Sequence, residues 1–212
     1  MSTQADALVK HGLLPMDKER CQEAGLVIGR AFKADPTLNL FFSQIRLAER
    51  ERRVAALYGD MLLAMLGRAE LVYSDHDGRI AGLGVILPPG AYPLPMTVNL
   101  VPLVRYVLRH GLYGIPPWVS FLSIREEEHP KEPCCYLDTL AVDPACQRQG
   151  HGSRVMRYLL DRADQDHVGV YLETTNGNNV AYYTKFGFEV RGPKVIKGLA
   201  SWFFWRPPVS QG

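Results

Sequence analysis

Residues 136–152 read YLDTLAVDPACQRQGHG, and this stretch decides how the chain folds. Its first seven residues are rich in β-formers. Asp143-Pro144 stops them, because proline removes a backbone donor and restricts the residue before it. Gly150 and Gly152 close the stretch, and from Ser153 to Asp166 apolar residues recur at helical spacing opposite a charged side. The pattern predicts a strand, a glycine loop and a helix, in that order.

The glycine loop has the composition of an anion site. The first amides of a helix have no partner inside the helix and point outward at the positive end of its dipole. Gly150 and Gly152 lack a Cβ, so an anion can approach the backbone closely, and Gln147 and Arg148 can add side-chain donors. These features favour a phosphate ligand. Taken alone, the loop is equally consistent with an ordinary strand-to-helix turn that happens to contain glycines.

The segment after this helix continues the alternation of strands and helices. Val168 to Glu173 reads as a short strand, and Asn176-Gly177-Asn178 as a turn. Asn178 or Asn179 can cap a short helix that runs through Phe186. Gly187 then ends this helix, and Phe188 to Ile196 is predicted to be a strand.

With these residues in view, the chain resembles the GNAT N-acetyltransferase superfamily. The first match is Leu140-Ala141-Val142-Asp143-Pro144 followed by Gln147-x-x-Gly150-x-Gly152, and the second is Tyr183-Thr184-Lys185-Phe186-Gly187-Phe188. Both occur in the family's order and at its spacing. Leu172-Glu173-Thr174-Thr175 with Asn179 is also similar to the branch of antibiotic acetyltransferases that includes puromycin N-acetyltransferase.

The resemblance implies an α+β fold with a splayed, mixed and largely antiparallel sheet of about six to seven strands flanked by helices. It implies that acetyl-CoA enters between the strands at 136–142 and 168–173, with its pantetheine on the backbone of Leu140 and Val142. The pyrophosphate is then expected on the loop amides. The implied cofactor residues are Leu140, Ala141, Val142, Gln147, Arg148, Gln149, Gly150, His151, Gly152, Ser153, Asn179 and Tyr183.

Catalysis by such a site is chiefly a matter of positioning. A backbone amide near Leu140 or Ala141 is expected to polarise the thioester carbonyl. The leaving thiolate benefits from a proton, and Tyr183 matches the family's usual acid. A phenol, whose ordinary pKa is ~10, is protonated at neutral pH and can donate. The alternative is that Tyr183 packs and only hydrogen-bonds the sulfur, while Tyr182 is expected to face elsewhere on the helix.

The general base has several candidates. Glu173, at the end of a strand, is the first, and Asp138 is the second, since strand alternation predicts that it shares a face with Tyr136 and Leu140. Glu126 to Glu128 and His129 could also reach the site, and a water relay needs no dedicated residue.

The rest of the chain supplies helices, a hairpin and an insertion. Helices are predicted from Asp17 to about Lys33, Leu47 to Leu66, Thr97 to His110 and Trp118 to His129. Strands are predicted from Glu70 to Ser74, Ile80 to Leu87 and Ser201 to Arg206, with a possible start of a first strand around Leu13. Asp75-His76-Asp77-Gly78 predicts the hairpin turn, and Gly82 and Gly84 indicate either a bulge or a close backbone approach.

Acceptor-binding residues are expected in two places. Phe41 and Phe42 lie between the first two helices, where aromatic pairs are more often core. The resemblance nevertheless keeps an acceptor-binding role open. The irregular segment at about 88–133 reads as a helical insertion on the acceptor side, and Trp118 and Phe121 are its candidate acceptor contacts.

Composition limits the remaining possibilities. The chain has 212 residues and a formal net charge of +2, which suits one domain spanning residues 1–212 and gives no reason to expect nucleic acid or a membrane as partner. It has no apolar run of membrane-spanning length and no secretory signal pattern. The four cysteines form no plausible metal set with the histidines, so no metal is expected, and reduced thiols favour the cytoplasm. The cysteines are Cys21, Cys134, Cys135 and Cys146.

The sequence therefore predicts an acetyl-CoA-dependent N-acetyltransferase acting on a primary amine of a small molecule or a peptide, by direct transfer in a ternary complex. A monomer and a homodimer are both compatible with it. One alternative is a non-catalytic acyl-CoA-binding domain of the same fold. A more remote one is a dinucleotide-dependent oxidoreductase, because Gly150-x-Gly152 precedes Glu173 by about twenty residues. Against it, Val155 stands where the third glycine belongs.

Overall fold

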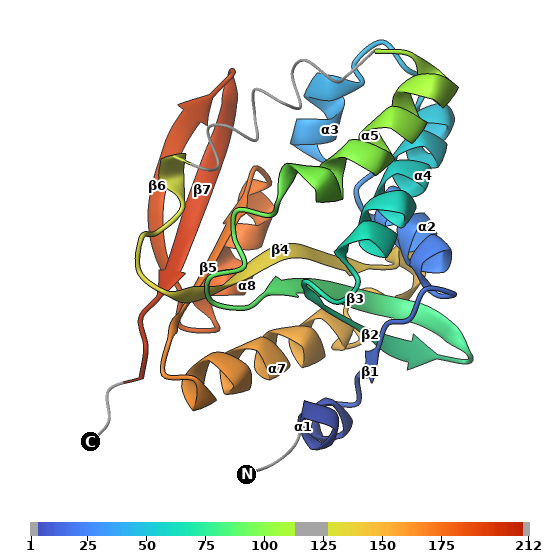
Figure 1. The fold of residues 1–212 in the computed structure, drawn as a ribbon. Helices are drawn as coiled ribbons and strands as arrows, with labels where there is room; N and C mark the ends of the chain where they lie inside the picture. The colour runs from blue at the N-terminus through green and yellow to red at the C-terminus, as the bar shows by residue number, and fades with distance from the viewer. Residues whose placement is uncertain (1–3, 113–126, 210–212) are drawn as a thin grey trace.

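The computed structural model describes residues 4–112 and 127–209, which form one seven-stranded sheet in the order β1-β2-β3-β4-β5-β7-β6 (Figure 1). Only β4 and β5 pair in parallel; the other neighbours are antiparallel. This arrangement confirms the predicted mixed and largely antiparallel sheet. The strands are β1 (Leu14–Pro15), β2 (Glu70–His76), β3 (Arg79–Leu87), β4 (Cys134–Val142), β5 (Gly169–Thr174), β6 (Glu189–Ile196) and β7 (Leu199–Arg206).

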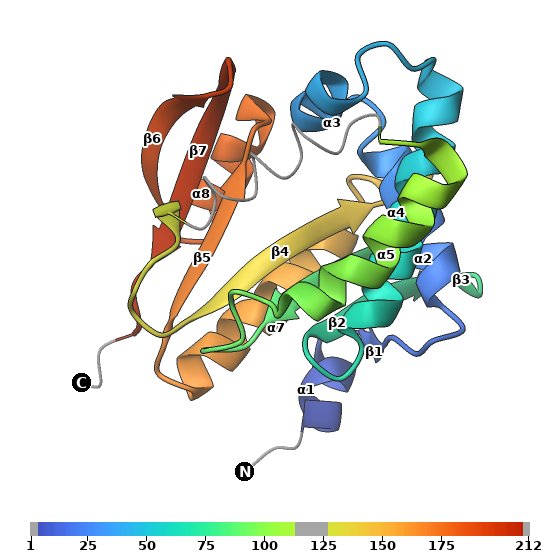
Figure 2. The ribbon, with the colours of Figure 1, turned by 45° about the horizontal axis from the view of Figure 1, so that its top comes forward.

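Helices cover both faces of the sheet, as Figures 1 and 2 show. One face carries α2, α4 and α5, and the other carries α1 and α7. The helices are α1 (Gln4–Lys10), α2 (Cys21–Ala31), α3 (Pro36–Phe41), α4 (Leu47–Met65), α5 (Met96–His110), α7 (His151–Gln165) and α8 (Val180–Thr184), with short 3-10 turns η1 (Pro144–Cys146) and η2 (Gly177–Asn179).

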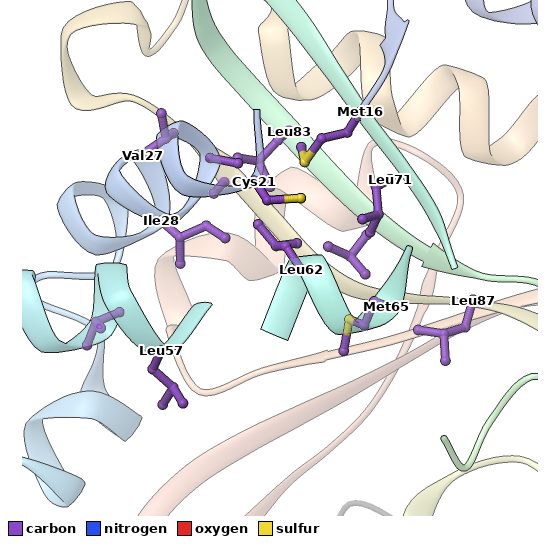
Figure 3. Close-up of a cluster of buried hydrophobic side chains, with 14 of the residues drawn as sticks. Met16, Cys21, Val27, Ile28, Leu57, Leu62, Met65, Leu71, Leu83 and Leu87 are labelled. Atoms are coloured by element: carbon purple, nitrogen blue, oxygen red, sulfur yellow. The ribbon is translucent and has the colours of Figure 1, made fainter. Parts of the chain in front are cut away.

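The main core lies between α2, α4 and the sheet (Figure 3). Cys21 and Ile28 of α2 meet Leu62 of α4 and Leu83 of β3, and all four side chains are buried. On the opposite face α7 contributes a second buried cluster. The sheet is therefore covered on both sides near its centre, where the site is built.

Glycines allow α2 and α4 to cross with their backbones almost in contact. A Cβ on Gly25 would lie 2.4 Å from the carbonyl oxygen of Ala55, and one on Gly29 would lie 2.6 Å from that of Glu51. Side chains at these positions would force the helices apart. The crossing fixes the angle at which α2 leads into the segment that carries α3.

Two further glycines seat α7 on the sheet. A Cβ on Gly82 would lie 2.9 Å from Cβ of His151, and one on Gly84 would lie 2.4 Å from Cγ1 of Val155. These β3 positions therefore mark a close approach of a helix to the sheet. The other alternative also holds beside Gly82, because the register between β2 and β3 shifts by one residue there. The contact holds the start of α7 against the middle of β3.

The hairpin and most of the predicted helices and strands are confirmed, with shifted ends. Asp77 and Gly78 form the turn between β2 and β3 with φ of 53° and 77°. The first predicted helix starts later, at Cys21, because Asp17 caps the preceding turn by accepting from the amides of Glu19 and Arg20. The helix predicted from Ser153 starts earlier, at His151.

Other predictions about local structure were wrong. The short helix after β5 ends at Thr184, not Phe186, and no side-chain cap bond is made by Asn179; instead Asn176 caps η2 through the amide of Asn178. Both α1 and α3 were missed. No helix was predicted at Asp35-Pro36, where α3 begins.

Part of the predicted insertion falls outside the described residues, including Trp118, Phe121, Glu126 and most of the helix predicted at 118–129. Its described part contains α5, which packs on α4. Within residues 4–112 and 127–209, no helix is both long and apolar enough to cross a bilayer.

We expect Gly25→Ala to lower the free energy of unfolding by about 1–3 kcal/mol, because its Cβ collides with the α4 backbone. Gly59→Ala is the matched control in the same interface: the three atoms nearest to its Cβ would all belong to the Gln22 side chain, which can move. Alanine also favours a helix over glycine by up to about 1 kcal/mol. Urea unfolding should give a lower free energy of unfolding for Gly25→Ala than for Gly59→Ala, with the same dependence on urea concentration in both variants. Equal stabilities would contradict the close crossing.

Candidate active site

The site begins where β4 and β5 separate. Their parallel pairing runs from Cys134 and Gly169 to Tyr136 and Tyr171. Beyond this point β4 stays paired with β3 as far as Val142, and β5 with β7. Within the described residues no strand pairs with the β5-facing side of β4 after Tyr136. Backbone groups at this edge are therefore open to a ligand.

A β-bulge at Asp138 sets the direction of the side chains along β4. Thr139 pairs with Val85 and Leu137 with Ile86, so Asp138 is an extra residue in the register of β4 with β3. The extra residue reverses the alternation of side chains. Tyr136 packs in the cluster on the α2 and α4 side, whereas Leu140 packs against the cluster on the α7 side. The prediction that they share a face, with Asp138 beside them, was wrong for this reason.

A cavity of about 540 Å³ lies at the glycine loop. It is lined by every residue predicted to contact the cofactor except Gln149, whose side chain instead donates to the carbonyl of Ala145. Gly150 caps α7 with φ of 88°, a left-handed conformation that suits glycine. The loop therefore directs the amides at the start of a fifteen-residue helix toward this cavity.

The loop is tied to α2 by an ion pair. The guanidinium of Arg30 donates to Asp143 Oδ2 from Nε at 2.9 Å. The other carboxylate oxygen, Oδ1, accepts from the amide of Ala145 and caps η1. Asp143 therefore positions the loop in addition to ending the strand.

His151 contributes its backbone to the cavity and its side chain to the core. The imidazole is buried, and Nδ1 lies 3.0 Å from Ser74 Oγ. Burial lowers the pKa of His151, with a smaller effect from Arg154, which favours the neutral ring. Its imidazole is thus not placed to neutralise a phosphate.

Tyr182 also lines the loop cavity, contrary to the expectation that it faces elsewhere. Its hydroxyl lies 3.1 Å from the position a Cβ on Gly152 would occupy. Its ring meets that of Tyr183 edge-on, with centroids 5.3 Å apart. The two adjacent tyrosines therefore form one side of this cavity together.

A second, smaller cavity of about 160 Å³ lies between α3, α4 and the diverging strands. Its walls include the rings of Phe32, Phe41, Phe42 and Tyr58. Phe41 and Phe42 thus belong both to the core, where each is buried, and to the cavity predicted for the acceptor. Three carboxyl residues border this cavity, and none of its described lining residues is a lysine, arginine or histidine. The three are Asp35, Asp138 and Glu173.

The two cavities adjoin. They share the lining residues Phe32, Asp35, Leu140, Asn179 and Tyr183. Tyr183 is buried, and its ring packs on Phe204 with centroids 5.2 Å apart. Burial raises the pKa of Tyr183, and the nearby Tyr182 and Glu173 add smaller effects of the same sign. Its hydroxyl therefore stays protonated throughout the physiological range and can act as a donor.

The carboxylates predicted as bases are held by neighbouring hydroxyls. Glu173 Oε1 accepts from the Tyr136 hydroxyl at 2.7 Å, and Asp138 Oδ2 accepts from Thr139 Oγ1 at 2.9 Å. Both border the smaller cavity but not the loop cavity.

Asp35 was missed as a site residue. Its Oδ1 accepts from the amides of Thr37 at 2.9 Å and Leu38 at 3.3 Å, which makes it the N-cap of α3. An aspartate followed by proline is a known helix-start pattern, so the sequence did carry a signal for this role. What the sequence does not show is that α3 brings this carboxylate to both cavities.

Side-chain bonds attach α3 to the rest of the site. Thr37 Oγ1 lies 2.7 Å from Thr175 Oγ1, just beyond the end of β5. The buried Arg50 donates to the carbonyl of Phe42 at 2.9 Å and also bonds to Asn39. These contacts join one wall of the smaller cavity to β5 and to α4.

Neither a nucleophilic cysteine nor a metal-binding cluster is found at this site among the described residues. Burial raises the pKa of the Cys134 thiol to about 11 and that of Cys135 to about 12. Thiols with raised pKa values are poor nucleophiles at neutral pH, and Cys146 borders neither cavity. Among the residues that the structure describes, no cluster of three or more histidine, cysteine or carboxylate side chains could hold a metal.

Comparison with known proteins agrees with this geometry. Residues 103–188 match the family model of the acetyltransferase (GNAT) family. A Corynebacterium glutamicum protein described as a histone acetyltransferase and related acetyltransferase superimposes with a TM-score of 0.71 at 21% identity, covering 94% of this chain and 97% of the other.

Two more distant structures share the fold. A polyamine N-acetyltransferase of Drosophila melanogaster gives a TM-score of 0.59 at 16% identity, covering 92% of this chain and 98% of its own. The ribosomal-protein-alanine N-acetyltransferase of Escherichia coli gives 0.51 at 16% identity, covering 94% of each chain. The described fold is therefore that of GNAT proteins.

We expect Gly152→Asp to lower the affinity for CoA at least tenfold, or by about 1.4 kcal/mol. Its Cβ would lie 3.3 Å from Val142 Cγ2 and 3.1 Å from the Tyr182 hydroxyl, and its charge would repel phosphate. Gln149→Glu is the matched control, since it adds the same charge beside the loop at a residue outside the cavity lining. Calorimetric titration with CoA measures both. Unchanged affinity in folded Gly152→Asp would remove the phosphate assignment.

Proposed function

We propose that this chain, which contains a GNAT-family acetyltransferase domain, transfers an acetyl group from acetyl-CoA to a primary amine of a small molecule in a ternary complex. The observation that carries the proposal is the junction of two cavities of opposite character at Tyr183. One presents helix-start amides suited to an anion, and the other presents carboxylates suited to a cation. Both substrates could thus be bound at once, with their reacting ends at the junction.

The residues at the loop fit a CoA pyrophosphate. No atom lies within 4 Å of the position a Cβ on Gly150 would take, so the space in front of the loop is open. Gln147 and Arg148 border the same space and can donate to phosphate oxygens. Acetyl-CoA, when bound, would supply the activated acyl group as a thioester.

The chain's own part in the reaction is positioning and proton handling. The open edge of β4 offers Leu140 and Val142 to the pantetheine amides, and a backbone amide near Leu140 or Ala141 would polarise the thioester carbonyl. Asn179, whose side chain donates to Thr174 Oγ1 at 3.3 Å, borders the junction and would contact the same arm.

The acceptor cavity supports a small amine over a longer peptide, because its volume is only about 160 Å³ and aromatic rings line it. Carboxylates in a cavity whose described lining contains no basic side chain favour binding of an ammonium group. Glu173, Asp138 and Asp35 are the carboxyl residues available to receive its proton. We further propose that the segment at 88–133 affects acceptor choice through the wall it supports, since Tyr106 lies 6.3 Å from Phe42, centroid to centroid.

The activity is tested with acetyl-CoA and a panel of primary amines such as 2-phenylethylamine and 1,4-diaminobutane, by detecting free CoA thiol. We expect turnover with at least one small amine and less with short peptides. CoA binding without turnover over the whole panel would instead support a non-catalytic acyl-CoA-binding domain.

We expect Tyr183→Phe to lower kcat ~10²–10⁴-fold with little change in the KM for acetyl-CoA, since it removes only the hydroxyl that would protonate the leaving sulfur. A thioester with a more acidic thiol needs less protonation on departure, so such a donor should reduce the deficit of the variant. Full kcat in Tyr183→Phe, measured where chemistry limits the rate, would leave this tyrosine with a packing role.

A further inference from the structure

Asp35 differs from the other carboxyl residues of the site in its position. Asp35 borders both cavities, whereas Asp138 and Glu173 border only the smaller one. It shares the junction with Tyr183 and Asn179. If the amine nitrogen is to reach a thioester carbon beside Tyr183, it must sit at this junction. A proton acceptor for that nitrogen has to lie there too, within hydrogen-bond reach.

The capping role of Asp35 is compatible with a second task. Both backbone amides that it caps, of Thr37 and Leu38, donate to the same oxygen, Oδ1. An ionised carboxylate offers about four acceptor sites on its two oxygens, so two cap bonds do not exhaust it. The cap also fixes the carboxyl group, because α3 is tied to β5 by Thr37 and Thr175.

We infer that Asp35 is the proton acceptor that converts the bound ammonium group of the acceptor into the attacking amine. The inference rests on the proposed function. In this assignment Glu173 and Asp138, which border only the smaller cavity, hold the acceptor by charge and hydrogen bonding. Their hydroxyl partners Tyr136 and Thr139 fix them in those positions.

The proton balance is complete with groups that are present. Asp35 takes one proton from the ammonium group and later releases it to solvent. The nitrogen lone pair forms the C–N bond with the acetyl carbon, and the C–S bond breaks. The thiolate takes a proton from Tyr183, which is restored by the second proton that the nitrogen loses. The products are the acetamide, CoA thiol and one proton in solution.

The environment of Asp35 strengthens it as a base. Its pKa is raised, mainly because burial disfavours the charge, while bonds from the amides of Leu38 and Thr37 and from the Thr37 side chain oppose the rise. A carboxylate with a raised pKa is a stronger base than one in water. Its ability to accept a proton is present above that raised pKa and is lost as the pH falls through it.

The substitution Asp35→Asn tests the charge without removing the cap, because an asparagine oxygen caps a helix about as well as an aspartate oxygen. We expect kcat/KM for 2-phenylethylamine, or for the best acceptor in the panel, to fall ~10²–10⁴-fold, with CoA affinity unchanged. The loss should shrink at high pH and with the less basic 2,2-difluoro-2-phenylethylamine, since both supply more neutral amine.

Stability gives a readout that does not depend on turnover. Because the fold raises the pKa of Asp35, its ionisation at neutral pH opposes folding, and a neutral asparagine avoids this cost. We therefore expect the Tm of Asp35→Asn to equal or exceed that of the wild type, whereas Asp35→Ala should lower it through loss of the cap. Asp17→Asn is the matched control: Asp17 caps a turn before α2, outside both cavity linings, and its variant should keep wild-type activity.

The outcomes separate this inference from the proposed function. If the wild type turns over no amine, the proposed function fails and the inference fails with it. If the wild type is active and Asp35→Asn matches it, only the inference is overturned. If Asp35→Asn loses kcat/KM by the same factor at every pH and with both amines, the inference is also overturned. Asp35 would then attract the charged amine without accepting its proton. We expect a higher KM for the amine in Glu173→Gln and in Asp138→Asn. Activity in both should still fall as the pH drops through the pKa of Asp35, whereas Asp35→Asn should lack this fall.

Discussion

The separation of β4 from β5 is the constraint on which the rest of the molecule depends. The two strands pair in parallel only as far as Tyr136 and Tyr171, and each then follows a different antiparallel neighbour. Separation within one sheet leaves polar backbone groups unpaired, which is unfavourable unless water or a ligand satisfies them. The Tyr136 hydroxyl bonded to Glu173 spans the strands close to the point where they part. A site for an extended, amide-containing ligand follows from this geometry before any side-chain chemistry is considered.

The two ends of this opening carry opposite charge. At one end, the start of α7 and the side chain of Arg148 provide partial and full positive charge. At the other, Asp35, Asp138 and Glu173 border a cavity whose described lining lacks basic residues. An anionic ligand and a cationic one would therefore be drawn to opposite ends and meet in the middle. Tyr183, kept protonated by burial, lies where they meet. The order of charges along the opening thus favours simultaneous binding of an anionic and a cationic ligand over binding of either in the other's place.

Much of the fold could be predicted from the sequence, because its signals are local. Asp77-Gly78 indicated the hairpin, and the glycines of the loop indicated the start of α7 together with nearly all residues of its cavity. The bulge at Asp138 could not be predicted, since it exists only in the pairing with β3. A helix of six residues such as α3 is too short for a periodic pattern, and isolated helices under ~12 residues are marginal. The cap that starts α3 is a local signal, whereas the bulge and the attachment of α3 to β5 and α4 depend on contacts distant in sequence.

This difference in origin leads us to expect that substitutions at one end of the site leave the other end unchanged. The loop end is built from the sheet and α7, where Gly82 and Gly84 leave room for close packing and little freedom for substitution. The wall of the smaller cavity depends on a short helix held by a cap at Asp35, one hydroxyl bond between Thr37 and Thr175, and the bonds of Arg50. Changing that wall would disturb few buried backbone contacts. We therefore expect substitutions on α3 to reshape the smaller cavity while the glycine loop keeps its structure, and the residue that caps α3, Asp35, is itself a carboxylate at the junction of the two cavities.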